Sequence, residues 1–269
     1  MIPAKFEYIK ASSVSEALAL LDKHGDDAQL IAGGHSLVPA MKLRLNQPGT
    51  VIDIGKIPGL NSIKEDGDDL VIGANCTHHQ IATSPIVKQK LNVLAQTAKS
   101  IGDIQVRNKG TIGGSLAHAD PAADYPAVIL ASDAKIEVEG INGKRSISGS
   151  DFFQGIYATA LGSHEMIIAI RIPKASNGVY LKFSHPASRF AVVGCAAIKN
   201  GAGISIGLTG VADHAYRASA VERAYDGDAK AASEHAVDGV AVMSDNFASS
   251  EYRSHLAKVF TERALSALG

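Results

Sequence analysis

Ala32-Gly33-Gly34-His35-Ser36 and Thr111-Ile112-Gly113-Gly114-Ser115 are two segments, about eighty residues apart, that each carry a pair of adjacent glycines with a serine close behind. Each pair follows an apolar run. Glycine has no Cβ, so its backbone can take positive φ and turn successive N–H groups toward one point, where an anionic oxygen can bind. If the fold brings the two segments together, they predict a cradle for the two phosphates of a dinucleotide. The alternative is that each glycine pair is only a tight turn.

Neither segment matches a common phosphate-binding motif. The sequence has no G-x-G-x-x-G that opens a helix after a first strand, and it has no G-x-x-x-x-G-K-[ST]. The prediction of a nucleotide site therefore depends on the two segments taken together and on the residues that flank them.

The composition is that of a globular protein. Apolar residues make up 46% of the 269 residues, charged residues make up 20%, and the formal net charge is −1. So small a net charge does not attract nucleic acid or an anionic membrane, and neither is expected as a partner. The first residues lack the apolar core of a secretory signal, and no apolar run reaches the roughly 18 residues that a membrane-spanning helix needs. A cytoplasmic protein is therefore expected.

Possible metal ligands are not grouped in the sequence. Cys76 and Cys195 are the only cysteines and lie far apart. They cannot hold an iron–sulfur cluster by themselves or build a disulfide framework, so two reduced, buried thiols are expected. The adjacent pair His78-His79 points to opposite sides of most backbones, and the sequence has no H-E-x-x-H. We predict no metal site and assign no catalytic residue.

Turn and cap signals divide the chain into three parts, 1–56, 57–174 and 175–269. The first is expected to be a β-α-β-α-β unit in which Ser13 and Glu16 form a capping box for a helix that Gly25 ends; its other elements are a strand at 29–32, a helix at 37–45 and a strand at 50–54. The second is expected to have strands at 60–63, 70–72, 135–139, 144–148 and 165–172, and helices at 91–101 and 125–131. The third is expected to have strands at 180–183, 191–199 and 203–209, and helices at 217–225, 229–241 and 251–268.

A longer stretch around the second glycine pair is more specific than the pair itself. It reads Gln105-Val106-Arg107-Asn108-Lys109-Gly110-Thr111-Ile112-Gly113-Gly114-Ser115-Leu116-Ala117-His118-Ala119-Asp120-Pro121-Ala122-Ala123-Asp124-Tyr125-Pro126. This stretch strongly resembles the FAD-binding medium subunit of the molybdenum hydroxylases, the family of aerobic carbon monoxide dehydrogenase and xanthine dehydrogenase. The first glycine segment and Leu161-Gly162-Ser163-His164-Glu165 agree with the same family. The resemblance covers the whole chain. It implies an α+β protein with the two-lobed FAD-binding fold of the vanillyl-alcohol-oxidase/CO dehydrogenase flavoprotein type, followed by a C-terminal three-stranded sheet with helices.

The resemblance implies that FAD binds between the first two parts of the chain. The backbone N–H groups and hydroxyls of both glycine segments would hold its diphosphate; these residues are Ala32, Gly33, Gly34, His35, Ser36, Thr111, Ile112, Gly113, Gly114 and Ser115. A branched side chain at Gly33 or Gly113 is expected to abolish FAD binding, because it would fill the space that the diphosphate needs. His35 is expected to position its loop and not to carry the flavin covalently.

Three further residues match cofactor contacts of the family. Asp124 corresponds to an aspartate that hydrogen-bonds the cofactor, with a helix N-cap as its alternative role. Leu161 corresponds to an apolar contact with flavin or adenine. Lys182 corresponds to a lysine near the isoalloxazine, where a cation stabilises negative charge on the reduced ring; the alternative is a solvated charge at a strand end. His118 is interpreted as a structural loop histidine, with a role in a proton relay as the alternative.

The implied function is that of an FAD-carrying electron-transfer subunit in a heteromeric molybdenum hydroxylase, an oxidoreductase. A molybdopterin-binding large subunit would oxidise the substrate, and a small [2Fe-2S] subunit would pass electrons to the FAD of this chain and on to an external acceptor. The implied assembly is a dimer of heterotrimers. Two other functions stay open: a self-contained flavin oxidoreductase of the enolpyruvylglucosamine reductase type, and a non-catalytic assembly subunit.

The external acceptor also stays open among oxygen, a quinone and NAD. Segment 187–191 lacks the acidic residues that eukaryotic xanthine dehydrogenases carry near the flavin, which weakens the case for NAD. Phe190 is the residue of this segment that is expected near the ring.

Overall fold

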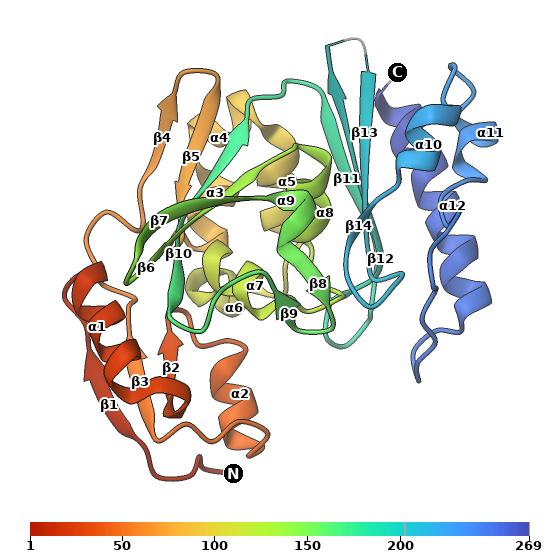
Figure 1. Ribbon diagram of the computed structural model, residues 1–269. Helices are drawn as coiled ribbons and strands as arrows, with labels where there is room; N and C mark the ends of the chain where they lie inside the picture. The colour runs from red at the N-terminus through yellow and green to blue at the C-terminus, as the bar shows by residue number, and fades with distance from the viewer. Residues whose placement is uncertain (202, 269) are drawn as a thin grey trace.

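The computed structural model describes residues 1–201 and 203–268, and the chain forms three larger sheets, each with its own helices (Figure 1). The α+β class implied by the resemblance is confirmed. The first lobe is a parallel sheet in the order β1-β3-β2, with strands β1 (Glu7–Lys10), β2 (Ala28–Ile31) and β3 (Thr50–Asp53). Its helices are α1 (Val14–His24), the short 3-10 helix η1 (Gly25–Asp27) and α2 (Leu37–Lys42).

Helix α1 begins almost as the capping box predicts. The Ser13 side chain accepts a hydrogen bond from the backbone N–H of Glu16 at 3.1 Å. The Glu16 carboxylate, however, accepts from the backbone N–H of Ser12 and not from that of Ser13. The helix is still fixed at its N-terminus, and its buried face packs on the first sheet.

The second lobe is an antiparallel sheet in the order β4-β5-β10-β6-β7. Its strands are β4 (Ile63–Asp66), β5 (Asp69–Gly73), β6 (Lys135–Gly140), β7 (Gly143–Ser148) and β10 (Glu165–Pro173). Between them lie α3 (His78–Thr83), α4 (Pro85–Lys90), α5 (Asn92–Ser100), α6 (Ile104–Lys109), α7 (Ile112–His118), α8 (Tyr125–Ala131), α9 (Gly149–Phe152) and the small hairpin β8 (Phe153–Gly155) and β9 (Ala158–Thr159). The largest hydrophobic core of the described residues lies between this sheet and its helices.

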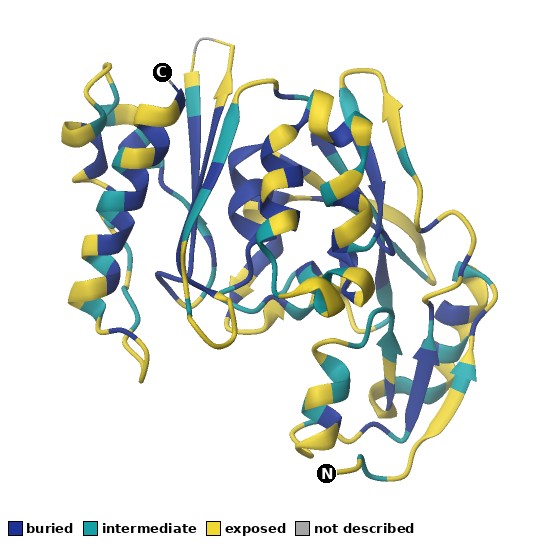
Figure 2. Ribbon diagram, turned by 180° about the vertical axis from the view of Figure 1, so that it is seen from behind, coloured by how far each residue is buried: buried dark blue, intermediate teal, exposed yellow. Residues whose placement is uncertain are grey.

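The third unit is an antiparallel sheet in the order β11-β12-β13-β14, and helices cover both of its faces (Figure 2). Its strands are β11 (Gly178–Ser184), β12 (Ala191–Asn200), β13 (Gly203–Thr209) and β14 (Tyr216–Arg217), and its helices are α10 (Ser219–Ala224), α11 (Ala229–Ser233) and α12 (Ser250–Leu268). Ala196 and Ile198 of β12 belong to the core of the second lobe, whereas Cys195 and Ala197 belong to the core beneath α12. A strand covered on both faces is apolar at consecutive positions, which explains the unbroken apolar run at 191–198.

Several predicted elements differ from the structure. The expected strand at 60–63 is wrong, because β4 begins at Ile63; Gly67 takes φ +57° and closes a tight hairpin in which Asp66 pairs with Asp69. The expected helix at 229–241 ends at Ser233, and the C-terminal sheet has four strands where three were predicted. Among the described residues, no helix is both long and apolar enough to span a membrane.

Candidate functional site

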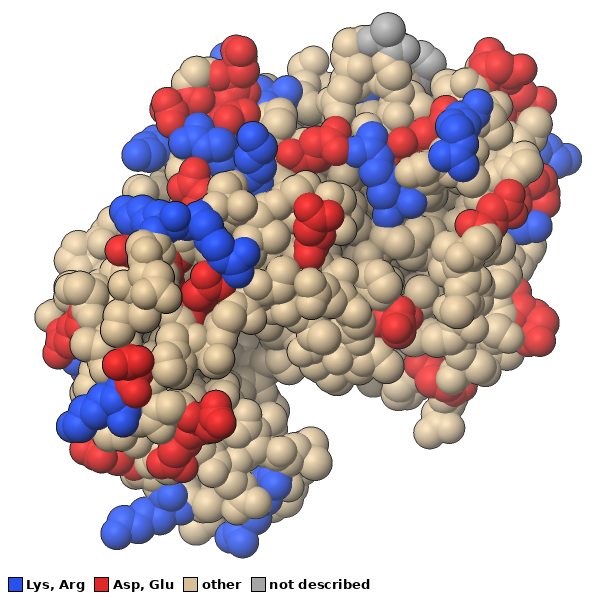
Figure 3. Space-filling view, viewed as in Figure 1, with Lys and Arg blue, Asp and Glu red and all other residues tan. Residues whose placement is uncertain are grey.

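A cavity of about 410 Å³ lies between the first and second lobes, and the third unit supplies part of its wall. In Figure 3 the surface is hollowed between the lobe that carries α2 and the body of the molecule, and the walls of this hollow are mostly uncharged in that view. The loop after β2 and the beginning of α7 meet at this cavity, so the two glycine segments, far apart in the sequence, are neighbours in the fold.

The first glycine segment is a loop with unused backbone donors. Gly34 takes φ +71°, a conformation that glycine adopts without strain. Among the described residues, no acceptor is hydrogen-bonded to the backbone N–H of Gly33, Gly34, His35 or Ser36. Four consecutive free N–H groups in the wall of a cavity can bind an anion such as a diphosphate.

The second glycine segment differs from the turn that the sequence led us to expect, because Gly113 and Gly114 lie in the first turn of α7. Thr111 caps this helix, and its hydroxyl oxygen accepts from the N–H of Gly114 at 3.2 Å. The N–H of Gly113 donates to the carbonyl of Ala74 at 2.9 Å, and the N–H of Ser115 donates to that of Thr111 at 3.0 Å. The amides of Gly113, Gly114 and Ser115 are therefore already paired within the protein, whereas the hydroxyls of Thr111 and Ser115 remain able to donate to a ligand.

Both glycine pairs allow close packing of backbone on backbone. A Cβ added at Gly33 would lie 2.7 Å from the carbonyl carbon of Lys109 and 2.8 Å from the Cα of Gly110. A Cβ added at Gly113 would lie 2.6 Å from the Cβ of Ala74. The absence of a side chain at Gly33 thus lets the first loop approach the second. This corrects the expectation that a side chain there would first meet the diphosphate.

The structure places eleven of the thirteen predicted cofactor-binding residues in the cavity wall: Ala32, Gly33, Gly34, His35, Ser36, Thr111, Gly113, Gly114, Ser115, Asp124 and Leu161. Ile112 does not line the cavity, because its side chain is fully buried in the core of the second lobe. Lys182 does not line it either, and its side chain is 6% exposed.

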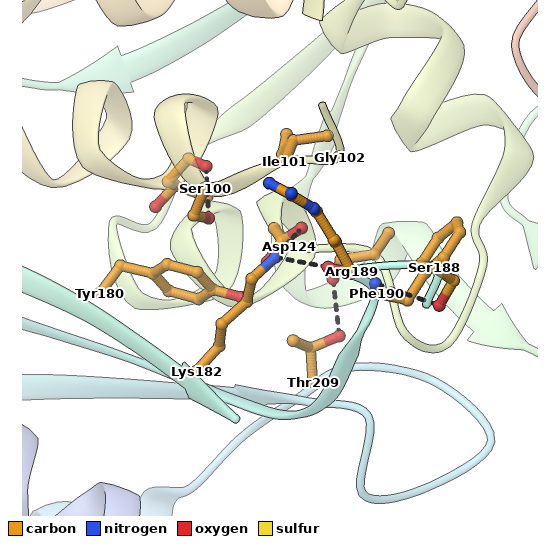
Figure 4. A network of polar contacts seen from close by, with 12 residues as sticks. Ser100, Ile101, Gly102, Asp124, Tyr180, Lys182, Ser188, Arg189, Phe190 and Thr209 are labelled. Carbon is orange, nitrogen blue, oxygen red and sulfur yellow. Dashed lines mark hydrogen bonds and ion pairs between the residues drawn. The ribbon is translucent and has the colours of Figure 1, made fainter. Parts of the chain in front are cut away.

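Asp124, Tyr180 and Lys182 form a buried polar cluster beside the cavity (Figure 4). The Asp124 carboxylate accepts from the Tyr180 hydroxyl at 2.6 Å and lies 2.9 Å from the Lys182 ammonium. Burial raises the pKa of Asp124 above its ordinary value, against the opposing pull of Lys182 and Tyr180. Asp124 is the N-cap residue of α8, but its side chain makes no capping hydrogen bond and contacts Tyr180 and Lys182 instead.

Lys182 is not the solvated strand-end charge considered as its alternative. Its ammonium is buried against Asp124 and also donates to the carbonyl of Arg189 at 2.8 Å. The segment Ser188, Arg189 and Phe190, held in this way, lines the cavity, as expected for Phe190. Figure 4 shows the Arg189 side chain reaching toward Ile101 and Gly102 at the cavity rim.

Comparison with known protein families shows to which family this chain belongs. Residues 4–175 match the family described as "FAD binding domain in molybdopterin dehydrogenase". The chain belongs to this family. The medium chain of carbon monoxide dehydrogenase from Hydrogenophaga pseudoflava is 41% identical over 99% of this chain and 98% of its own length. The medium subunit of nicotine 6-hydroxylase from Paenarthrobacter nicotinovorans is 35% identical over 100% of this chain and 98% of its own length.

Solved structures of this family share the fold along the whole chain. Carbon monoxide dehydrogenase from Hydrogenophaga pseudoflava aligns with a TM-score of 0.95 and 42% identity, covering 100% of this chain and 98% of the other. Quinoline 2-oxidoreductase from Pseudomonas putida 86 aligns with a TM-score of 0.93 and 30% identity, with the same coverage of both chains. The predicted resemblance is confirmed: this is an FAD-binding medium subunit of the molybdenum hydroxylase type, a flavoprotein subunit of an oxidoreductase.

The residues of the cavity fit the FAD that defines this family. Its volume falls within the roughly 300–1,000 Å³ of typical ligand pockets. The free N–H groups of the first loop suit a diphosphate, and Thr111 and Ser115 add hydroxyl groups to the wall of the same cavity. Within 1–201 and 203–268, no group of three or more His, Cys, Asp or Glu side chains is arranged to bind a metal ion.

Sequence reasoning missed Asn75 and His78 in the cavity wall, and it treated His118 as structural. Burial lowers the pKa of His78 to about 4, so its ring is neutral, and its Nδ1 lies 3.1 Å from the Tyr125 hydroxyl. The structure contains a complete capping box at Thr77, which marks where α3 begins but not which of its residues face the cavity. His118 lines the cavity and its ring packs against Tyr157 with centroids 4.9 Å apart.

Proposed function

We propose that this chain is the FAD-carrying electron-transfer subunit of a heteromeric molybdenum hydroxylase. In that assembly a molybdopterin-binding large subunit oxidises the substrate, and a small subunit with [2Fe-2S] clusters passes the electrons to this chain for delivery to an external acceptor. The observation that carries the proposal is the meeting of the two glycine segments at one cavity, with four free backbone donors in its wall.

Each part of the cavity has a proposed role. The amides of Gly33, Gly34, His35 and Ser36 hold the diphosphate, and the hydroxyls of Ser36, Thr111 and Ser115 add donors. FAD, when bound, supplies the redox chemistry, and the protein supplies its position and its surroundings. Asp124 lines the cavity with both carboxylate oxygens in contact with Lys182 and one of them also with Tyr180, while Leu161 packs on an apolar part of the cofactor.

Lys182 has a more restricted role than the resemblance implied. Because Asp124 neutralises its ammonium, Lys182 contributes little net charge to the cofactor. Its contact with the Arg189 carbonyl instead fixes the segment that closes the cavity. We divide the chain into FAD-binding subdomains 1–56 and 57–174 and a C-terminal domain 175–269, a division supported by the three sheets.

The relatives support partners for this subunit. Two of them are named as medium chains or subunits, and a protein from Paenarthrobacter nicotinovorans that is 34% identical is named as subunit alpha of a 6-hydroxypseudooxynicotine dehydrogenase complex. A medium chain in a dimer of heterotrimers is our proposal for the present protein. The two cysteines, both buried and free in the described structure, support a reducing compartment such as the cytoplasm.

The test compares the full chain alone with the chain co-expressed with its partner subunits. The purified chain, reconstituted with FAD, should show flavin absorbance but no turnover of its own. In the complex, substrate should bleach the flavin band, and stopped-flow mixing with oxygen, a quinone or NAD should identify the acceptor. Turnover by the chain alone with a reduced nicotinamide would instead indicate a self-contained flavin oxidoreductase. Failure to take up any flavin would indicate an assembly subunit.

A further inference from the structure

Asn75 joins the two lobes at the wall of the cavity. It follows β5 in the second lobe, is 5% exposed, and lines the cavity. Its side-chain Nδ2 donates to the carbonyl of Ile54, at the end of the first lobe's sheet, at 2.6 Å. Its backbone N–H donates to the carbonyl of Leu60 at 2.7 Å. The side chain is therefore held in one orientation by the connection between the two lobes.

The other end of the Asn75 amide is unpaired. Its Oδ1 is buried and has no hydrogen-bond partner among the described residues. Turning the amide over would place Oδ1 against the Ile54 carbonyl, two acceptors at hydrogen-bond distance, so the Ile54 contact fixes which atom is the orphan. Buried polar groups in folded proteins have partners almost without exception, and an unpaired one is costly. An orphaned acceptor on a residue that lines a ligand cavity points to a donor on the ligand.

We infer that Asn75 is a cofactor-binding residue whose Oδ1 accepts a hydrogen bond from a hydroxyl or N–H group of FAD. Ionised phosphate oxygens only accept hydrogen bonds, so this contact is made with the adenosine, ribityl or flavin part and not with the diphosphate. The inference rests on the proposed FAD site, but it is independent of the glycine segments. Because Nδ2 of the same amide holds Ile54, the contact also links cofactor binding to the junction of the lobes.

The experiment measures FAD binding to the full chain by quenching of flavin fluorescence, and thermal unfolding with and without FAD. Asn75→Ala removes both amide groups, and Asn75→Leu replaces the amide by an apolar group of similar branching. The Ile54 carbonyl keeps a hydrogen bond from the N–H of Ile57 at 3.2 Å in both variants, so neither leaves it unpaired. Asn61→Ala, an exposed asparagine in the same connection between the lobes, is the matched control.

Both Asn75 variants should bind FAD about tenfold more weakly, the loss expected for one buried hydrogen bond, while their melting temperature without FAD stays within about 2 °C of wild type. ADP and FMN as separate probes locate the donor, because only the half that carries it should lose affinity. Wild-type FAD affinity in both variants would overturn the inference, and so would an equal loss for ADP and FMN, which signals a general collapse of the cavity. If the wild type itself binds no FAD, the proposed function fails first, and the two failures are thereby distinguished.

Discussion

Gly33→Ala tests whether the contact between the two glycine segments is needed for cofactor binding. The added Cβ would lie 2.7 Å from the carbonyl carbon of Lys109 and 2.8 Å from the Cα of Gly110, where ordinary contacts begin at about 3.4 Å. Both neighbours are backbone atoms and cannot rotate away. The first loop and the beginning of the second segment must therefore separate by more than half an ångström, and the free donors of the first loop move with it.

The magnitude follows from the cost of overpacking. Forcing one methyl group into a closely packed site costs roughly 1–3 kcal/mol. If the FAD-bound state carries that cost because the segments must stay close to hold the diphosphate, FAD affinity falls about 5- to 150-fold. If the free protein carries it, the free energy of unfolding falls by the same roughly 1–3 kcal/mol.

The assay is an FAD titration of the full chain together with urea denaturation of the FAD-free chain. Gly203→Ala is the matched control, since the nearest atom of the described residues to a Cβ there would be the Asn200 carbonyl oxygen, at 3.9 Å. The control should behave as wild type in both measurements. If Gly33→Ala also shows wild-type affinity and wild-type stability, the close approach of the two segments does not have the importance argued for it.

Three other predictions concern buried side chains, each measured by urea denaturation. Burial holds the pKa of His78 at about 4 in the folded chain, against an ordinary 6.5. The unfolded chain therefore takes up a proton first as the pH falls, and the free energy of unfolding of the wild type should fall by about 2 kcal/mol between about pH 6.5 and pH 5. His78→Gln should lose this pH dependence. Lys182→Met leaves the Asp124 carboxylate buried without its cation and should lower the free energy of unfolding by about 3 kcal/mol. Because burial already raises the pKa of Asp124, this variant should regain stability on acidification. Adding Asp124→Asn should restore most of the loss at neutral pH. Arg253, 3% exposed at its side chain, donates to two main-chain carbonyls at 2.6 and 2.5 Å and to Asp245 at 2.7 Å, so Arg253→Ala should cost at least about 3 kcal/mol while the folded fraction keeps wild-type FAD affinity. Wild-type stability of the Lys182 or Arg253 variant would contradict its prediction, and a wild-type pH dependence in His78→Gln would contradict the first.

Local signals predicted much of the fold. The cap at Ser13 and the apolar periodicity of 91–101 depend on neighbours within one or two turns, and helices α1 and α5 lie where these signals indicate. The strands expected at 60–63 and 70–72 left 65–68 between them, whereas Glu65 and Asp66 lie in β4 and only Gly67 and Asp68 form the turn. A helix was expected over 229–241 from its alanines, but α11 ends at Ser233. The helix propensity of alanine is not sufficient here, because a short helix depends on tertiary contacts for its stability.

The site was less predictable because its geometry arises from contacts distant in the sequence. The glycine pairs were visible, but nothing in 111–115 showed that the amides of Gly113 and Gly114 are already paired with Ala74 and Thr111. Asn75 and His78 gave no signal of their own, since their place in the cavity depends on how β5 meets the first lobe. The resemblance supplied Asp124, but only the fold showed that Tyr180 and Lys182 hold it.

The family match ends at residue 175, yet Ser188, Arg189 and Phe190 help to line the cavity. From the same unit, the Thr209 hydroxyl lies 2.8 Å from the carbonyl of Ala123, the residue before Asp124 (Figure 4). An expression fragment that ends at residue 175 would therefore retain both glycine segments but lack one wall of the cavity and the side chains that support Asp124. Engineering that exchanges C-terminal domains between medium subunits therefore also exchanges part of the wall of this cavity, the FAD site that we propose.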